Sequence, residues 1–227
     1  HGGVERAYLK QEFASISSRP YYWYRWLRRH LSIRHYIELR LQERLYRGGR
    51  VKRVIAISSM VKRDILAHFD FPPDRIHVIF NAVDLERFHP STVDRLRKRA
   101  RADMGIGDSE MLLLFAGNNY RLKGLEPLLK ALALLKARFP DRAVRLVVAG
   151  RGQQWLYKRI ARKLGVVDSV LFPGSVKEMD PYYAAGDIYV HPTFYDSCSL
   201  TVLEALACGL PAVTTRFNGA ADAITTD

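Results

Sequence analysis

Cysteine is scarce in this 227-residue chain, which contains only Cys198 and Cys208. Their spacing matches no pattern of metal ligands or redox cysteines, so the sequence disfavours a metal centre and a catalytic thiol. Long apolar runs are missing as well, since no stretch of about eighteen apolar residues offers a membrane span. The opening, HGGVERAYLK, has neither an initiator Met nor the apolar core of a signal peptide. We therefore expect a cytoplasmic protein whose first residue lies inside a longer reading frame.

Acidic residues are outnumbered: 23 Asp and Glu stand against 36 Lys and Arg, which gives a formal net charge of +13. The excess gathers in residues 19–53, where eleven Arg and Lys face only Glu38 and Glu43. Apolar side chains recur there at helical spacing, namely Trp23, Leu27, Leu31, Ile33, Ile37, Leu41 and Leu45. This pattern predicts an amphipathic helix, or a pair of helices, ended by Gly48 and Gly49.

Three interpretations of this basic, aromatic segment are open. The apolar stripe can face the core of the protein beneath a solvated basic face. Alternatively, residues 19–53 form a surface for anionic lipid, because Trp and Tyr suit the membrane interface and Arg is attracted to a negatively charged leaflet. A nucleic-acid surface ranks last, because no nucleic-acid motif accompanies the segment.

The remainder of the chain alternates between strand and helix patterns. A strand and a capped helix are predicted over residues 51–69, then a short strand over 76–80 and a helix with a linker over 91–110. Five apolar strands follow, at 111–117, 144–150, 170–176, 187–193 and 211–215, separated by helices. Because each strand is a near-continuous apolar run, we predict an α/β fold with a doubly wound parallel sheet.

The ligand edge of such a sheet lies beyond the carboxyl ends of its strands. The first of the five strands is followed there by GNNYRLKG, which holds Gly117, Arg121, Lys123 and Gly124. Glycines let the backbone approach a ligand, and cations before a helix suit a diphosphate. The stretch is neither G-x-G-x-x-G nor G-x-x-x-x-G-K-[ST], which disfavours dehydrogenases and phosphate-loop NTPases.

One carboxylate needs an explanation: Glu204 lies in LTVLEALACG, a helix that is otherwise apolar or small. A desolvated carboxylate without a partner is unfavourable by several kcal/mol, so Glu204 should meet a ligand or a protein group, for example Arg216. Asp196 precedes it by eight residues in a polar turn and can also be a simple turn former. His191, just before Pro192, is expected to be packed rather than catalytic.

The carboxyl half of the chain resembles the nucleotide-sugar domain of GT-B glycosyltransferases, specifically the retaining glycosyltransferase family 4. The resemblance rests on FAGNNYRLKGLEPLLKAL, on IARKLGVVDSVLFPGSV and above all on HPTFYDSCSLTVLEALACGLPAVTT. The last stretch matches the family's E-x(7)-E motif, with Asp196 in place of the first Glu and Glu204 as the second. VIFNAVDLERFHP matches the region that enters the linker between domains. The basic helix is similar to that of lipopolysaccharide core glucosyltransferases, and the resemblance covers about residues 51–227.

The resemblance implies roles for the residues that match. Glu204 is expected to accept hydrogen bonds from the ribose hydroxyls of the nucleotide. Arg121 and Lys123 are expected to neutralise the diphosphate in place of a metal ion. Gly117 and Asn118 belong to the same donor-binding turn, and Asn118 stands where the family usually has an Arg.

Further roles concern the donor sugar. The resemblance places Asp196 by the sugar hydroxyls, and it directs the backbone N–H groups of Cys198, Ser199 and Leu200 at the sugar and the phosphate. Here Ser-Cys-Ser replaces the family's Gly-Phe-Gly. His1 is compatible with a family His near the donor sugar.

We accordingly predict a GT-B protein with a partial amino-terminal Rossmann-like domain over residues 1–105, on the acceptor side. Residues 106–227 are predicted to form the nucleotide-sugar-binding domain, truncated at its carboxyl end. The implied activity is retaining transfer of a hexose from a nucleotide sugar, UDP-glucose above all, to a glycan or glycolipid such as lipopolysaccharide core. We expect no metal, no cofactor and no nucleic-acid partner, peripheral contact with the inner face of the plasma membrane through residues 19–53, and no turnover by this chain alone.

Two other functions are considered. One is a basic membrane- or nucleic-acid-binding module on a non-catalytic Rossmann scaffold. The other is a GT-B epimerase or phosphorylase, which would need different residues in the part of the chain that precedes His1.

Overall fold

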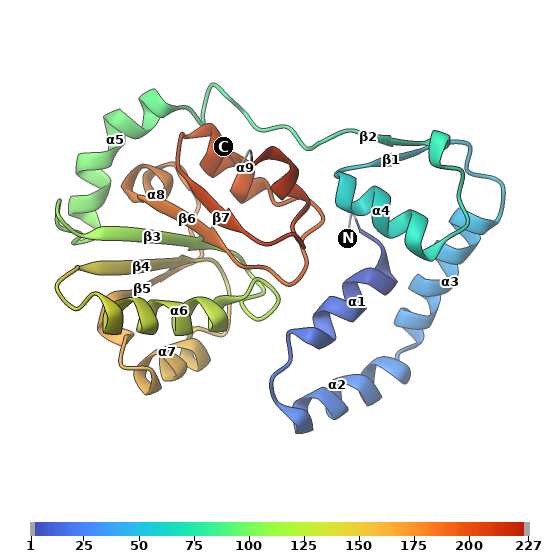
Figure 1. Cartoon of the computed structure of the whole chain (residues 1–227), viewed down its shortest axis with the longest axis horizontal. Coiled ribbons are helices and arrows are strands. Elements are labelled where there is room, and N and C mark those ends of the chain that lie inside the picture. The colour runs from blue at the N-terminus through green and yellow to red at the C-terminus, as the bar shows by residue number, and fades with distance from the viewer. Residues whose placement is uncertain (1–2, 225–227) are drawn as a thin grey trace. The chain divides into compact units, whose positions relative to one another are not determined.

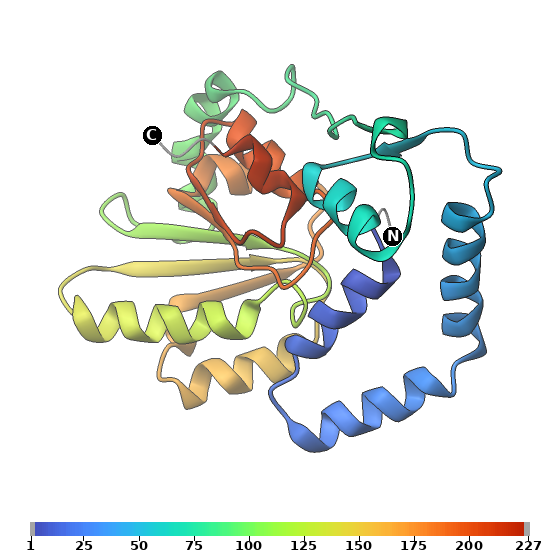
Figure 2. The same ribbon diagram turned by 45° about the vertical axis from the view of Figure 1, so that its right-hand side comes forward.

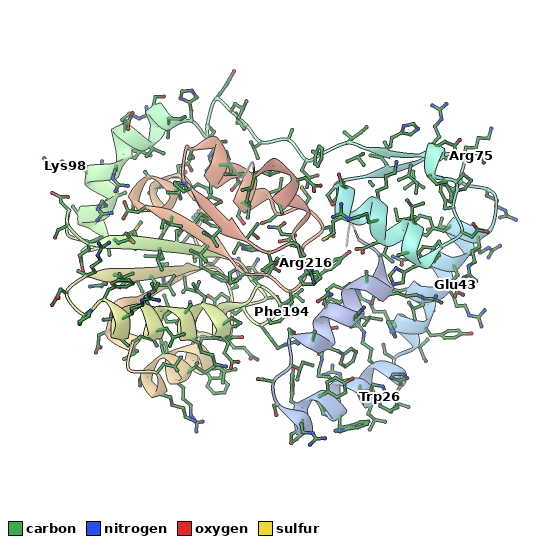
Figure 3. The ribbon with its side chains drawn as sticks, viewed as in Figure 1. Trp26, Glu43, Arg75, Lys98, Phe194 and Arg216 are labelled. Atoms are coloured by element: carbon green, nitrogen blue, oxygen red, sulfur yellow. The ribbon has the colours of Figure 1, made fainter. Side chains whose placement is uncertain are left out.

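The computed structural model describes residues 3–224, which separate into two compact units. Residues 3–81, 194–199 and 216–224 belong to the first unit, and residues 82–193 and 200–215 to the second. Figure 1 shows the elements of both, and Figure 3 labels Phe194 and Arg216, which begin the two short segments of the first unit. Within residues 3–224, no helix combines the length and hydropathy that crossing a bilayer requires.

Five parallel strands form the sheet of the second unit, in the order β5-β4-β3-β6-β7. Their bounds are Met111–Ala116 for β3, Val144–Ala149 for β4, Val170–Gly174 for β5, Ile188–His191 for β6 and Ala212–Thr214 for β7. Strands β3 and β4 pair over six residues, from Met111 opposite Val144 to Ala116 opposite Ala149. These parallel pairings confirm the predicted sheet. Its long apolar strands need cover on both faces.

Helices cover both faces of this sheet. Their bounds are Pro90–Asp103 for α5, Leu125–Arg138 for α6, Gln154–Lys163 for α7, Asp180–Ala185 for α8 and Leu200–Ala207 for α9, with a 3₁₀ turn η2 at Val167–Ser169. Helices α6 and α7 lie on one face, and α5, α8 and α9 lie on the other (Figures 1 and 2). Leu125, Leu129 and Leu132 of α6 are fully buried against Phe115 and Leu146 of the sheet. The fold is therefore the doubly wound α/β arrangement that the sequence predicts.

The first unit holds a two-stranded parallel sheet and four helices. The bounds are Val54–Ala56 for β1, Ile76–Val78 for β2, Glu5–Ala14 for α1, Arg19–His30 for α2, Ile33–Arg47 for α3 and Ser59–His68 for α4, with 3₁₀ turns η1 at Pro73–Arg75 and η3 at Gly219–Ala223. The Ser58 Oγ accepts a hydrogen bond from the Val61 N–H at 3.2 Å, so Ser58 caps α4 as predicted. Gly48 follows the last residue of α3, also as predicted.

The basic segment forms the pair of helices α2 and α3, but its apolar stripe does not face the core. Trp23, Leu27, Leu31, Ile33, Ile37, Leu41 and Leu45 are all exposed. Within residues 3–224 the stripe therefore does not pack against the core as that interpretation expects, because polar side chains occupy the inner faces. Helix α1 has no counterpart in the sequence-based prediction, because two of its four buried residues are the glutamates Glu5 and Glu12.

Candidate functional site

Two glycines bring backbone segments into contact at the carboxyl edge of the sheet. Gly150, after β4, has φ +125°, and a Cβ there would lie 2.1 Å from the carbonyl oxygen of Gly117, after β3. Only glycine permits this conformation and this approach. The side-chain oxygen of Asn118 accepts a hydrogen bond from the Arg151 N–H at 2.8 Å. Gly117 and Asn118 therefore join the β3–α6 and β4–α7 connections into one rigid rim.

The predicted diphosphate-binding cations lie in the same β3–α6 connection. Arg121 and Lys123 are half-buried, and a Cβ on Gly117 would lie 3.1 Å from the Lys123 Cγ. Gly124 has φ +78°, and a Cβ there would lie 2.0 Å from the carbonyl oxygen of Pro192, just after β6. The structure thus brings Gly117, Asn118, Arg121 and Lys123 together on one turn, next to the end of β6.

Glu204 of α9 meets a protein group, and that group is a tyrosine. The Tyr183 hydroxyl of α8 donates a 2.6 Å hydrogen bond to the Glu204 Oε2. Burial of Tyr183, followed by the nearby Tyr189 hydroxyl and the Glu204 carboxylate, raises the pKa of the Tyr183 phenol well above its ordinary value. The phenol therefore stays protonated and remains a donor. From the sequence a cation such as Arg216 was the expected protein partner of Glu204, and no local pattern pointed to Tyr183.

An ion pair between Arg87 and Asp180 lies near Glu204. The Arg87 guanidinium binds the Asp180 carboxylate through two contacts, Nε to Oδ1 at 2.8 Å and a terminal nitrogen to Oδ2 at 2.5 Å. The hydrogen bond from Arg87 lowers the pKa of Asp180, and Glu204 contributes to the raised pKa of Arg87. Arg87 and Asp180 line a polar hollow of about 540 Å³, together with Glu86, Thr92, Arg95, Leu96, Lys177, Glu178 and Pro181. This hollow adjoins the β5–α8 connection, at the edge of the sheet where a ligand is expected.

His191 and the two cysteines are buried. His191 is buried, and its ring stacks between those of Phe115 and Tyr189, with centroids 6.0 Å from each. The expectation of a packed histidine is confirmed. Burial raises the pKa of the Cys198 thiol and raises that of Cys208 to about 11. Both thiols are therefore poor nucleophiles near neutral pH.

The segment 194–199, which holds Asp196, belongs to the first unit. The Asp196 N–H donates to the Phe217 carbonyl at 2.9 Å, and the Gly219 N–H donates to the Asp196 carbonyl at 2.8 Å. The Ser58 hydroxyl donates to the Ser197 carbonyl at 2.7 Å. These backbone contacts fix the polar turn within the first unit and leave the role of the Asp196 carboxylate a prediction.

Asn218 uses one of the backbone donors that were expected to face a ligand. The side-chain oxygen of buried Asn218 accepts from the Ser199 N–H at 3.2 Å and from the Ala220 N–H at 3.0 Å. The Ser199 N–H therefore already has a partner within the protein. Cys198 is buried and Leu200 begins α9. His1 lies outside the described residues.

One group of side chains within residues 3–224 has ligand atoms close enough for a metal ion. The ligand atoms of Glu5, His35 and Glu38, in the first unit, lie within 4.8 Å of one another. Glu5 Oε1, however, already accepts from the Arg29 guanidinium and lies 3.4 Å from the His35 Nδ1. A cation would have to compete with this guanidinium, so we assign the group to an ion-pair network.

A family model that covers more than half of the chain identifies the family. The model described as "Glycosyl transferases group 1" matches residues 110–227, more than half of the chain, and "Glycosyltransferase Family 4" matches residues 3–87. The chain belongs to the group 1 glycosyl transferases. The resemblance on which the sequence-based assignment rests is confirmed.

Several curated proteins and solved structures are similar to this glycosyl transferase. It is 36% identical over 177 residues to the D-inositol 3-phosphate glycosyltransferase of Pseudarthrobacter chlorophenolicus, covering 76% of this chain and 41% of that protein. It resembles the crystal structure of WaaG, a glycosyltransferase involved in lipopolysaccharide biosynthesis, with 25% identity, a TM-score of 0.76 and coverage of 86% and 52% of the two chains. The Anabaena HepE structure in complex with UDP-glucose shares the fold, with 22% identity, a TM-score of 0.68 and coverage of 86% and 54%. The chain therefore spans about half the length of these relatives, and the GT-B fold is confirmed.

Proposed function

We propose that the protein transfers a hexose, with retention of configuration and without a metal, from a nucleotide-diphosphate sugar to a glycan or glycolipid acceptor. UDP-glucose is the proposed donor, and the structural likeness to HepE, solved with UDP-glucose, supports it. The observation that carries the proposal is the Glu204 carboxylate. It is half-buried on an apolar helix, and the neutral Tyr183 hydroxyl donates a hydrogen bond to its Oε2. Such a carboxylate has acceptor capacity left for the hydroxyls of a ribose.

The cations of the β3–α6 connection provide the charge stabilisation. Departure of the sugar leaves negative charge on the diphosphate, and cations fixed before that charge develops stabilise the transition state. Arg121 and Lys123 are held on a turn whose backbone is locked by Gly117, Gly124 and the end of β6. We propose these two side chains, with the N-terminal turn of α6, as the diphosphate contacts. The roles of Asp196 with the sugar hydroxyls and of the Cys198 and Leu200 N–H groups stay predictions from the family resemblance.

Replacing Glu204 by Ala tests the donor site. The substitution removes the proposed ribose hydrogen bonds, each about 1.5–3 kcal/mol for a charged acceptor, so UDP should bind at least about tenfold more weakly by calorimetric titration. Asp141→Ala is the matched control, because Asp141 is an exposed carboxylate before β4, at the opposite edge of the sheet. An unchanged dissociation constant for UDP in Glu204→Ala would refute the assignment, and thermal melts of both variants separate lost affinity from lost stability.

Two classes of acceptor are candidates. The likeness to WaaG, a glycosyltransferase involved in lipopolysaccharide biosynthesis, supports a lipopolysaccharide acceptor, whereas the names of the curated relatives support D-inositol 3-phosphate. Transfer of labelled glucose to each, measured side by side, decides between a glycolipid and a phosphorylated polyol. A cytoplasmic protein at the inner face of the plasma membrane fits the glycolipid acceptor.

A further inference from the structure

Backbone carbonyls of the 194–199 turn are held by side chains from elsewhere in the first unit. The Ser58 hydroxyl, fully buried where it caps α4, donates to the Ser197 carbonyl at 2.7 Å. The Asn81 side chain donates to the Cys198 carbonyl at 3.2 Å. Because these two neighbouring carbonyls are bound from different segments, the path of the backbone through the turn is fixed from outside it.

One buried side chain of the 194–199 turn reaches α4. Tyr195 has 4% of its surface exposed, and its hydroxyl donates to the Asp64 Oδ2 at 3.0 Å. Burial, followed by the Asp64 carboxylate, raises the pKa of the Tyr195 phenol well above its ordinary value, so the phenol stays a donor. Its ring packs edge-on with that of Tyr8, with centroids 5.9 Å apart. Figure 3 labels Phe194, the residue before Tyr195.

The Tyr195 hydroxyl is also an acceptor, and it joins α4 to two further groups. It accepts from the Ser197 hydroxyl, two residues further along the chain, and from the Val4 N–H. A Cβ on Gly3 would lie 2.4 Å from the Tyr195 hydroxyl oxygen and 2.8 Å from the Ser197 Oγ. A side chain larger than that of glycine therefore cannot enter there without displacing both hydroxyls.

Asp64 is the charged end of a chain of hydrogen bonds that runs through Tyr195 to Ser197. It lies half-buried on the second turn of α4. Hydrogen bonds to a charged acceptor are roughly twice as strong as those between neutral groups, and bonds in a chain strengthen one another. Because Tyr195 directly precedes Asp196, a displaced phenol would displace the backbone that carries the Asp196 carboxylate.

We propose that Asp64 and Tyr195 are positioning residues for the sugar of the donor. The Asp64 carboxylate holds the Tyr195 phenol, and the phenol keeps the 194–199 turn in the form that presents the Asp196 carboxylate to the sugar hydroxyls. The inference rests on the proposed function, in which Asp196 lies by the donor sugar. It adds two side chains that act through the turn and do not touch the ligand themselves.

The free nucleotide and the nucleotide sugar should respond differently to a change in this pair. UDP has no sugar for Asp196 to contact, and the contacts proposed for it are Glu204, Arg121 and Lys123. UDP-glucose carries the sugar and needs the turn in place. A loss of positioning should therefore change the affinity for UDP-glucose and leave that for UDP nearly unchanged, whereas a general loss of structure weakens both.

Calorimetric titrations with UDP-glucose and with UDP test the pair. Tyr195→Phe removes one oxygen and keeps the ring, so the dissociation constant of UDP-glucose should rise about threefold to tenfold, while that of UDP changes less than about twofold. Asp64→Ala should give the same shift, because it removes the acceptor of the same phenol. Asp64→Asn keeps an oxygen that can accept from the phenol, so its dissociation constants should stay within about twofold of those of the unsubstituted protein.

Tyr46→Phe is the matched control, because Tyr46 is a partly buried tyrosine of the same unit whose ring packs against those of Phe69 and Phe71. It should bind both ligands as the unsubstituted protein does. The double variant Asp64→Ala/Tyr195→Phe should bind UDP-glucose no more weakly than either single variant, because both remove the same hydrogen bond. Thermal melts of each variant measure any loss of stability.

Two results would overturn this inference alone. The first is equal binding of UDP-glucose by Tyr195→Phe and Tyr46→Phe, and the second is a parallel rise of both dissociation constants in Tyr195→Phe. If Tyr195→Phe does not fold, equal binding of UDP-glucose by Asp64→Ala and Asp64→Asn overturns it instead. Unchanged binding of UDP by Glu204→Ala, or no binding of either ligand by the unsubstituted protein, refutes the proposed function and this inference with it.

Discussion

The hydrogen bond between Tyr183 and Glu204 can be removed without changing the shape of the core. Tyr183→Phe deletes one oxygen and keeps the ring, which is fully buried. A hydrogen bond to a charged group contributes about 1.5–3 kcal/mol, and water can replace part of it because Glu204 is only half-buried. We therefore expect the free energy of unfolding to fall by about 1–2 kcal/mol. For a chain of this size that lowers the melting temperature by about 2–8 °C.

The same substitution should weaken nucleotide binding, because the phenol holds the carboxylate that we propose as the ribose ligand. A glutamate freed from this contact has to be ordered again when UDP binds, which is unfavourable by about 0.5–1.5 kcal/mol. The dissociation constant of UDP should therefore rise about twofold to tenfold. Thermal melting and calorimetric titration measure the two effects separately.

Tyr182→Phe is the control for this prediction, since Tyr182 is the neighbouring residue of α8 and is only partly buried. A double-mutant cycle of Tyr183→Phe with Glu204→Gln isolates the energy of the pair. If Tyr183→Phe melts and binds UDP as Tyr182→Phe does, or if the cycle gives no coupling, the reasoning about Glu204 is refuted.

Two further predictions concern the second unit. Gly150→Ala should destabilise the protein by roughly 2–5 kcal/mol, because it adds backbone strain and forces a Cβ onto the Gly117 carbonyl; Gly165→Ala, with φ +69° but open space around it, should lose only about 1–2 kcal/mol in urea melts. Burial alone would raise the pKa of Asp187, but hydrogen bonds from the Leu112 N–H and the Arg97 guanidinium outweigh it and lower that pKa. The ionised Asp187 carboxylate therefore stabilises the fold fully above the unfolded-state pKa of about 3.9, and this stabilisation is lost as the pH falls through the lower folded-state pKa. In Asp187→Asn the urea concentration at the midpoint of unfolding should decline less steeply below about pH 4 than in the unsubstituted protein. An equally steep decline in both proteins would count against this account.

The sheet of the second unit was predictable because its signals are local. Leu112 to Ala116 form a continuous buried run, and Gly117 directly follows it, so both the strand and its end can be recognised from neighbouring residues. Gly117, Arg121 and Lys123 could be assigned to one turn for the same reason. The topology rule for parallel sheets then places that turn at the ligand edge.

Partners that are distant in the sequence could not be predicted. An amphipathic pattern reveals that α2 has two faces, but it does not tell which face is inside. The side chains that decide this are Glu5 and Glu12, on a helix whose own pattern looks polar. Likewise, Asn218 binds the Ser199 N–H across nineteen residues, and Tyr183 binds Glu204 across twenty-one. These contacts depend on the tertiary structure and leave no periodic signal.

The carboxylates of α1 also determine which face of α2 lies inward. Glu12 accepts from the Arg25 guanidinium and Glu5 accepts from the Arg29 guanidinium, so α2 cannot turn over without breaking two largely buried ion pairs, which is strongly unfavourable. The orientation of α2 is therefore encoded on another helix, and a substitution at Glu5 or Glu12 acts on α2 without changing any residue of α2.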